Sequence, residues 1–193
     1  MKTVFFDLET TGVDFERSAV IQIGAILDVD GEEVDRIDIK LRPHEGANID
    51  SKALAVTGLT IEDLMEDGSR FSPQQGYWAF MKFLGFRPSQ RVTIPDRIHR
   101  AGYNILGFDN RFLEILGSRA GDNYTFAKFH WPGIDVASIA CAGLRSYRGG
   151  MKDFKLMSVA KMLGLDTEGQ AHDALFDVQV TRDLYYEIIS RGL

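Results

Sequence analysis

The chain has 193 residues, of which 45% are hydrophobic, and its formal net charge is −6. This length and composition predict one globular domain over residues 1–193 and exclude a disordered tail or a small disulfide-stabilised scaffold. The acidic balance argues against a broad basic face that holds long duplexes, because such binding depends on neutralised phosphates.

The first 41 residues predict three strands in hairpin connection. A buried strand over 2–8 is followed by an Ile- and Val-rich strand over 19–29 and an alternating strand over 33–41. Asp30-Gly31 is a hairpin turn signal between the second and third strands. This arrangement predicts that the three strands are antiparallel.

Helices and strands alternate in the rest of the chain. The pattern predicts two short helices within 50–66, a helix from Pro73 to about Leu84, a short strand within 97–104, a helix from about Asp109, a strand that ends at Asp135, and helices over about 136–144, 155–163 and 173–190. The order predicts an α/β fold in which a mixed sheet is flanked by helices.

Four Asp-x-Glu tripeptides occur in the sequence, and only one of them extends an apolar strand. In a strand, residues two apart point to the same side, so Asp7 and Glu9 direct two carboxylates together. Such a pair is costly unless a cation lies between them. The other three tripeptides, Asp14/Glu16, Asp30/Glu32 and Asp166/Glu168, fall in turns or loops where acids are common.

Two further acidic signals lie far along the chain. If the last helix begins near Asp173, then Asp173 and Asp177 lie one turn apart on one face, and His172 lies just outside the helix. The simpler interpretation is that Asp173 caps an amphipathic helix. Asp109 falls near the start of its own helix, where the helix dipole favours an aspartate without any function.

Taken together, these residues resemble the DEDDh subfamily of DnaQ-like 3′ to 5′ exonucleases, in the ribonuclease H-like superfamily. The first family motif is matched by residues 7–12, DLETTG, the middle motif in part by Tyr103-Asn104 and Phe108-Asp109, and the third by His172 followed five residues later by Asp177. The segment 56–60, VTGLT, and the Leu-rich stretch 156–165 agree as well. The resemblance therefore spans nearly the whole chain and implies a ribonuclease H-like fold.

The resemblance implies a two-metal phosphodiesterase that releases 5′-mononucleotides from 3′ ends. Two Mg²⁺ or Mn²⁺ ions would be held by oxygen ligands, and His172 would be the general base, since an imidazole ordinarily titrates near neutral pH. The catalytic and metal-binding candidates are Asp7, Glu9, Asp109 and Asp177, with His172. The substrate-binding candidates are Leu8, Thr10, Thr11, Thr57, Gly58, Asn104 and Phe108.

Departures from the family pattern concern the middle motif. Tyr103 stands where the family frequently has histidine, and one extra residue separates Asn104 from Phe108. The sister subfamily has a tyrosine four residues before the final aspartate, whereas this chain has Asp173 there. That difference excludes the tyrosine subfamily.

Two alternative functions remain open at this point. His172-Asp173 is also the central dipeptide of HD-type phosphohydrolases, although these need further histidines in a helical domain. A non-catalytic DEDD-like subunit that binds nucleic acid or acts as a scaffold is the other alternative. Release of mononucleotides that depends on metal distinguishes the exonuclease from the non-catalytic subunit.

The expected partners are 3′ ends of single-stranded DNA or RNA, with no membrane, and the resemblance also allows a homodimer. No apolar run is long enough to cross a bilayer, so the cytoplasm is the expected location. Cys141 is expected to be a small core residue. Two local clusters of basic residues are either solvated faces or phosphate-binding tracks: Lys82/Arg87/Arg91/Arg97/Arg100 and Arg145/Arg148/Lys152/Lys155. The aromatic segment FAKFHW at 126–131 is either part of the core or a platform on which bases stack.

Overall fold

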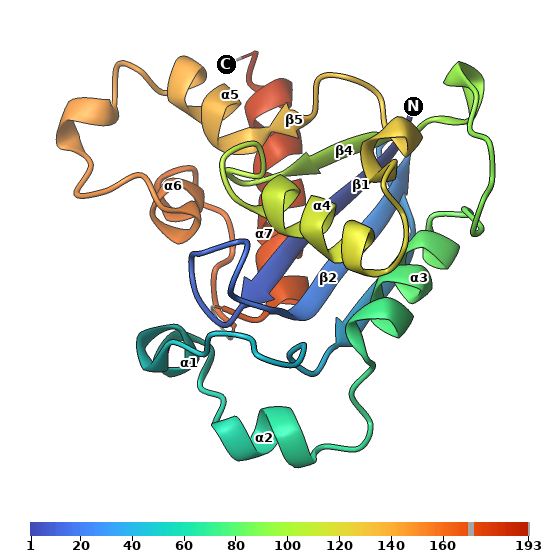
Figure 1. The fold of residues 1–193 in the computed structure, drawn as a ribbon. Helices are drawn as coiled ribbons and strands as arrows, with labels where there is room; N and C mark the ends of the chain where they lie inside the picture. The colour runs from blue at the N-terminus through green and yellow to red at the C-terminus, as the bar shows by residue number, and fades with distance from the viewer. Residues whose placement is uncertain (170–171, 193) are drawn as a thin grey trace.

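A computed structural model describes residues 1–169 and 172–192 (Figure 1). Its centre is a five-stranded mixed sheet with the strand order β3-β2-β1-β4-β5. The strands are β1 (Lys2–Thr10), β2 (Val20–Val29), β3 (Glu32–Lys40), β4 (His99–Gly102) and β5 (Ile134–Asp135). The first three strands are antiparallel, whereas β4 pairs parallel with β1 and with β5. The predicted mixed sheet is therefore confirmed.

The β2–β3 hairpin turns at the predicted dipeptide. Asp30 and Gly31 have φ values of 54° and 94°, the left-handed backbone that a two-residue hairpin turn requires. Asp28 stabilises the turn, because its carboxylate accepts a hydrogen bond from the Gly31 N–H at 2.9 Å. The Asp30/Glu32 tripeptide thus has the structural role in a turn that the sequence predicted.

Helices cover both faces of the sheet. They are α1 (Ser51–Thr57), α2 (Ile61–Glu66), α3 (Pro73–Phe83), α4 (Asp109–Arg119), α5 (Val136–Gly143), α6 (Leu156–Met162) and α7 (Ala174–Ser190), with short 3₁₀ turns at Ile94–Asp96, Thr125–Lys128 and Arg148–Gly150. None of the helices in the described part of the chain is both long and apolar enough to cross a membrane.

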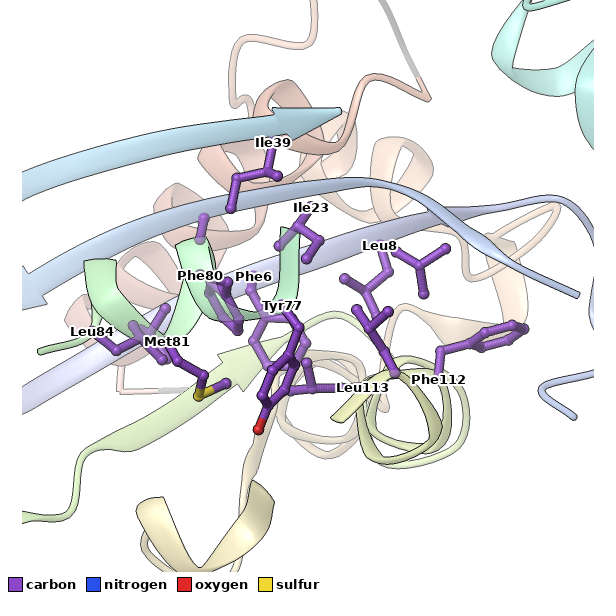
Figure 2. Packing of buried hydrophobic residues seen from close by; sticks show 14 of the residues in the cluster. Phe6, Leu8, Ile23, Ile39, Tyr77, Phe80, Met81, Leu84, Phe112 and Leu113 are labelled. Carbon is purple, nitrogen blue, oxygen red and sulfur yellow. The ribbon is translucent and has the colours of Figure 1, made fainter. Parts of the chain in front are cut away.

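The side chains of β1 alternate between two cores. Phe6 and Leu8 pack with residues of α3 and α4, such as Tyr77 and Leu113, as Figure 2 shows. Phe5 faces the other side, where it packs with residues of α5, α6 and α7. Because both phenylalanines are buried, the strand that carries the first acidic pair is anchored on both faces of the sheet.

The N-terminus of α7 lies directly on β2 at Gly24. An added Cβ at this glycine would lie 2.3 Å from the Ala174 carbonyl carbon and 2.4 Å from the Leu175 nitrogen. Gly24 is also the cross-strand partner of Asp7. The missing side chain therefore allows α7 to begin beside the acidic end of β1.

Gly24→Ala is expected to destabilise the protein by about 3 kcal/mol, the upper end of the range for overpacking, because the clashing atoms belong to a helix backbone. Denaturant unfolding measures this change. Gly150→Ala is the matched control, since an added Cβ there meets nothing within 4 Å. Equal stabilities for the two variants would show that α7 does not need this close approach.

Cys141 was expected in the core, and this prediction is wrong. It lies in α5 and is exposed. Val136, Ala140 and Leu144, spaced four residues apart, form the buried side of that helix. An apolar run alone does not show which side of a helix is covered, and Cys141 falls on the open side.

Candidate metal-binding active site

Asp7 and Glu9 lie near the end of β1, on the face covered by α7. The parallel pairing between β1 and β4 ends at Phe5 and Ala101, so within the described part of the chain β1 has no strand partner on that side from Asp7 onward. Each of these two side chains is half-buried. The early end of β4 thus leaves one edge of β1 open next to the two carboxylates.

Asp109 occupies the edge that β4 leaves open. It is the first residue of α4, is only 3% exposed, and accepts a hydrogen bond from the Leu8 N–H at 3.0 Å. This N–H belongs to the residue between Asp7 and Glu9. The bond therefore both satisfies a backbone donor of β1 and brings the third carboxylate to the acidic pair.

The start of α7 completes the cluster. Asp173 is the N-cap and accepts from the Phe176 N–H at 3.1 Å, as the sequence predicted. His172 precedes it with φ of 66° and is exposed. Glu9, His172 and Asp177 each offer a ligand atom, and these atoms lie within 4.8 Å of one another.

Gln22 holds this end of α7 in place and was not identified from the sequence. It is buried, and its Nε2 donates to Asp38 Oδ1 at 2.8 Å and to Asp173 Oδ2 at 3.1 Å, while its Oε1 accepts from the Ala174 N–H at 3.4 Å. Gln22 is also the cross-strand partner of Glu9. The available signal was a lone amide inside the apolar strand VIQIGAIL.

The carboxylates share a strongly anionic, partly desolvated environment. Burial, followed by the charge of Asp109, raises the pKa of Asp7 well above its usual range. Burial and the charge of Asp177 raise the pKa of Glu9 to about 8, and burial raises the pKa of Asp109 to about 7. The pKa of Asp177 rises to about 6, again chiefly through burial. All four groups are therefore costly to ionise without a cation.

The donor set fits a hard divalent cation. Asp177 Oδ1 is buried and has no hydrogen-bond partner among the residues that the structure describes. Buried polar atoms are usually satisfied, so this oxygen is available to a ligand. Four carboxylates supply the oxygen ligands that Mg²⁺ or Mn²⁺ prefers, whereas zinc favours sets rich in Cys and His.

These pKa shifts predict how stability depends on pH when metal is removed. The folded-state pKa values of these carboxyl groups are raised above the unfolded values of about 4. The folded state therefore has its full stability below about pH 4, where the carboxyl groups are protonated in both states. It loses stability as pH rises towards 8, because the unfolded chain ionises more readily. In EDTA the melting temperature should therefore fall between pH 5 and 8.

Millimolar Mg²⁺ or Mn²⁺ should reverse this loss. At a metal concentration about a hundredfold above Kd, the melting temperature of a domain of this size should rise by roughly 5–10 °C. The rise should be larger at pH 8. Differential scanning fluorimetry at both pH values measures the effect. A melting temperature that does not respond to metal at pH 8 would count against a cation site.

The side chains of the substrate candidates from the first motif take part in packing and local hydrogen bonds. Leu8 lies in the core next to α4, and the Thr10 hydroxyl donates to the Gly12 carbonyl at 2.8 Å. Thr11 is fully buried, and its hydroxyl donates to the Asn48 carbonyl and accepts from the Ala19 N–H. These three side chains support the scaffold of the site, and substrate binding by this segment stays a prediction.

The other substrate candidates lie in two segments near the site. Thr57 borders a cavity of about 130 Å³ that is also lined by Gln22 and His172. Gly58 is exposed and ends α1 with φ of 71°. In the second segment, just before Asp109, Asn104 is exposed with φ of 63°, and Phe108 packs on Phe112 with ring centroids 4.9 Å apart.

The geometry does not favour the HD-type alternative. The Asp173 carboxylate is already bonded to Gln22 and to the α7 backbone. Within residues 1–169 and 172–192, the group of side chains that could hold a metal ion contains a single histidine, His172, with two carboxylates. His99 stacks instead on His130, with ring centroids 4.4 Å apart. The several histidines that an HD site needs are therefore not gathered in the described part of the chain.

The fold is ribonuclease H-like, and comparisons with known proteins find similar nucleases. The family model described as RNase_T, Exonuclease, matches residues 4–87. Ribonuclease T of Shewanella frigidimarina is 27% identical over 97% of this chain and 82% of its own length. The PolC-type DNA polymerase III of Thermotoga petrophila is 27% identical over 96% of this chain, which spans 12% of that protein.

Solved structures show the same fold. The zinc-bound E. coli exonuclease I complex with single-stranded DNA superposes with a TM-score of 0.78 at 20% identity, covering 98% of this chain and 40% of exonuclease I. A complex of the same enzyme with a dT13 oligonucleotide gives a TM-score of 0.77. In sequence and fold the chain is similar to the DnaQ-like 3′ to 5′ exonucleases.

Proposed function

We propose that this exonuclease hydrolyses the terminal phosphodiester bond at the 3′ end of single-stranded nucleic acid and releases 5′-mononucleotides. The observation that carries the proposal is the meeting of Asp7, Glu9, Asp109 and Asp177 with His172 at the open edge of β1. Single-stranded DNA is the favoured substrate and RNA is also accepted. Residues 1–193 act as one exonuclease domain.

The four carboxylates would hold two divalent cations, Mg²⁺ or Mn²⁺. Such ions stabilise the charge that develops on the phosphoryl group, the attacking water and the leaving oxygen. By the family pattern Asp7 would contact both ions, Glu9 and Asp177 would complete one site, and Asp109 would serve the other. Support comes from the raised pKa values of all four groups and from the unpartnered Asp177 Oδ1.

His172 would accept the proton of the attacking water. Its position outside α7 and its exposure leave the ring free to approach a substrate, while its ligand atom lies within 4.8 Å of those of Glu9 and Asp177. Imidazole is the most common general base in enzymes near neutral pH.

The terminal nucleotide would lie between two flanks of the site. Thr57 and Gly58 form one flank, and Asn104 and Phe108 form the other. Aromatic and apolar contacts with bases tolerate any sequence, which suits an enzyme that removes each base in turn.

A single gel tests this function. Single-stranded and duplex DNA and RNA, each labelled at the 5′ end, are incubated with Mg²⁺, Mn²⁺ or EDTA. A ladder that shortens from the 3′ end, needs metal and is strongest for single-stranded DNA is expected. Intact substrate under all metal conditions would reject the proposal in favour of a binding or scaffold role.

A further inference from the structure

A strongly basic segment joins α5 to α6 and continues into α6. Residues 145–161, here called the basic segment, hold five cationic residues and one carboxylate in a chain whose net charge is −6. The cations are Arg145, Arg148, Lys152, Lys155 and Lys161. The basic segment is therefore positively charged, whereas the rest of the chain carries the excess of negative charge.

A hydrogen bond places the middle of the basic segment beside the active site. The Tyr103 hydroxyl donates to the Phe154 carbonyl oxygen at 2.6 Å. Tyr103 directly follows β4, which runs parallel to β1, so it lies at the same edge of the sheet as Glu9. Tyr103, the residue that departs from the family's frequent histidine, thus fixes the basic segment at the edge where substrate would enter.

The cations near Phe154 are open to solvent. Arg148, Lys152 and Lys155 are exposed, and the Arg148 guanidinium lies 4.5 Å from the Phe154 ring centroid. Among the described residues, none of the three takes part in an ion pair. A nearby carboxylate, Asp153, accepts a hydrogen bond from the Lys155 N–H at 3.2 Å.

Binding a nucleic acid strand at this acidic site requires positive charge near the site, and the basic segment carries such charge. The carboxylate cluster repels the phosphates of a strand, and cations bound there would neutralise only the phosphate at the scissile bond. Nucleotides further from the 3′ end require positive charge supplied by the protein. The basic segment is exposed, cationic and anchored at the correct edge.

We propose that the basic segment binds the phosphodiester backbone of the single strand, several nucleotides upstream of the 3′ end held at the metal site. This inference rests on the proposed function, because it assumes that the strand ends between Thr57 and Phe108. It makes Arg148, Lys152 and Lys155 determinants of affinity for long substrates and leaves the chemical step to the site itself.

The test compares two triple variants with the same change of charge. Arg148→Ala/Lys152→Ala/Lys155→Ala removes three cations of the basic segment, and Lys82→Ala/Arg87→Ala/Arg91→Ala removes three exposed cations elsewhere. The control cluster lies at the end of α3 and in the segment that follows it. A hydrogen bond from Lys2 Nζ to the Leu84 carbonyl, at 3.3 Å, shows that this end of α3 lies beside the start of β1. The length of β1, roughly 25–30 Å, separates that cluster from the site edge.

Affinity is measured by fluorescence anisotropy in Mg²⁺ buffer. The probe is a 20-nucleotide DNA strand with a 5′ label and hydrolysis-resistant phosphorothioate linkages at its 3′ end. The basic-segment variant is expected to raise Kd at least about tenfold and to lower the slope of log Kd against log salt by about 2, since each phosphate contact on a single strand contributes about 0.7. The control variant should change neither quantity appreciably.

Two outcomes would overturn the inference. An unchanged Kd for the basic-segment variant would remove its role, and an equal loss in the control variant would show that only net charge matters. Because the probe reports binding without hydrolysis, the two Kd values can be interpreted even if the wild-type protein releases no mononucleotides. A failure to release mononucleotides would reject the proposed function separately. A dinucleotide, too short to reach the basic segment, should be cleaved equally by the wild type and both variants.

Discussion

Asp7→Asn is expected to lower kcat for release of mononucleotides by about 10³-fold or more. The reason is that Asp7 is the carboxylate whose pKa is raised by every other acid of the site, so it lies at the centre of the charge that a cation would neutralise. Losing a metal ligand removes several kcal/mol of transition-state stabilisation, and 1.36 kcal/mol corresponds to about a factor of ten in rate. The measurement is initial rate on a 5′-labelled strand at saturating Mg²⁺.

The same substitution should raise the melting temperature in EDTA, because it removes a buried carboxylate that other carboxylates repel. Activity and stability therefore move in opposite directions, which a misfolded variant cannot imitate. Asp30→Asn is the matched control: it changes the same residue type in another Asp-x-Glu tripeptide, at a φ of 54° that asparagine tolerates. Full activity in Asp7→Asn would remove Asp7 from the metal site.

His172→Ala is expected to lower kcat by roughly 10²- to 10⁴-fold, the usual contribution of a general base. KM and the melting temperature should change little, because the side chain is exposed and lies outside α7. Metal-induced stabilisation should also remain, since Asp7, Glu9, Asp109 and Asp177 are unaltered. Steady-state kinetics and melting curves with and without Mg²⁺ measure these quantities.

His44→Ala is the matched control for this second variant. His44 is half-buried and contacts Arg119, with 3.0 Å between its Nδ1 and the Arg119 Nη1, and it is not part of the acidic cluster. It should retain wild-type kcat. If His172→Ala loses its response to Mg²⁺ in melting curves, the imidazole is a metal ligand and the assignment of His172 as the base is wrong.

Local sequence rules were sufficient for the parts of the site that depend on periodicity. Alternation along β1 put Asp7 and Glu9 on one face, and capping preference identified Asp173 as the N-cap of α7. The Asp30-Gly31 turn and the antiparallel order of the first three strands followed from equally local signals. These predictions are confirmed because each depends on residues only a few positions apart.

Burial on a particular side could not be predicted in the same way. Cys141 was expected inside and is exposed, because helix packing rather than composition decides which side of α5 is covered. Leu8 and Thr11 match a substrate-binding motif, yet their side chains are used by the core and by the Asn48 loop. A motif specifies which residues are present but not which of their atoms remain free.

The sequence by itself determined the set of acids, the strand that carries the first pair and the family resemblance, because these depend on residue identity and short-range periodicity. Only the tertiary structure decided how they meet. The early end of β4 frees the Leu8 N–H for Asp109, and Gly24 and Gln22 allow α7 to start beside β1. Contacts between residues about 100 and 150 positions apart arise from strand order and backbone packing, which no local pattern specifies.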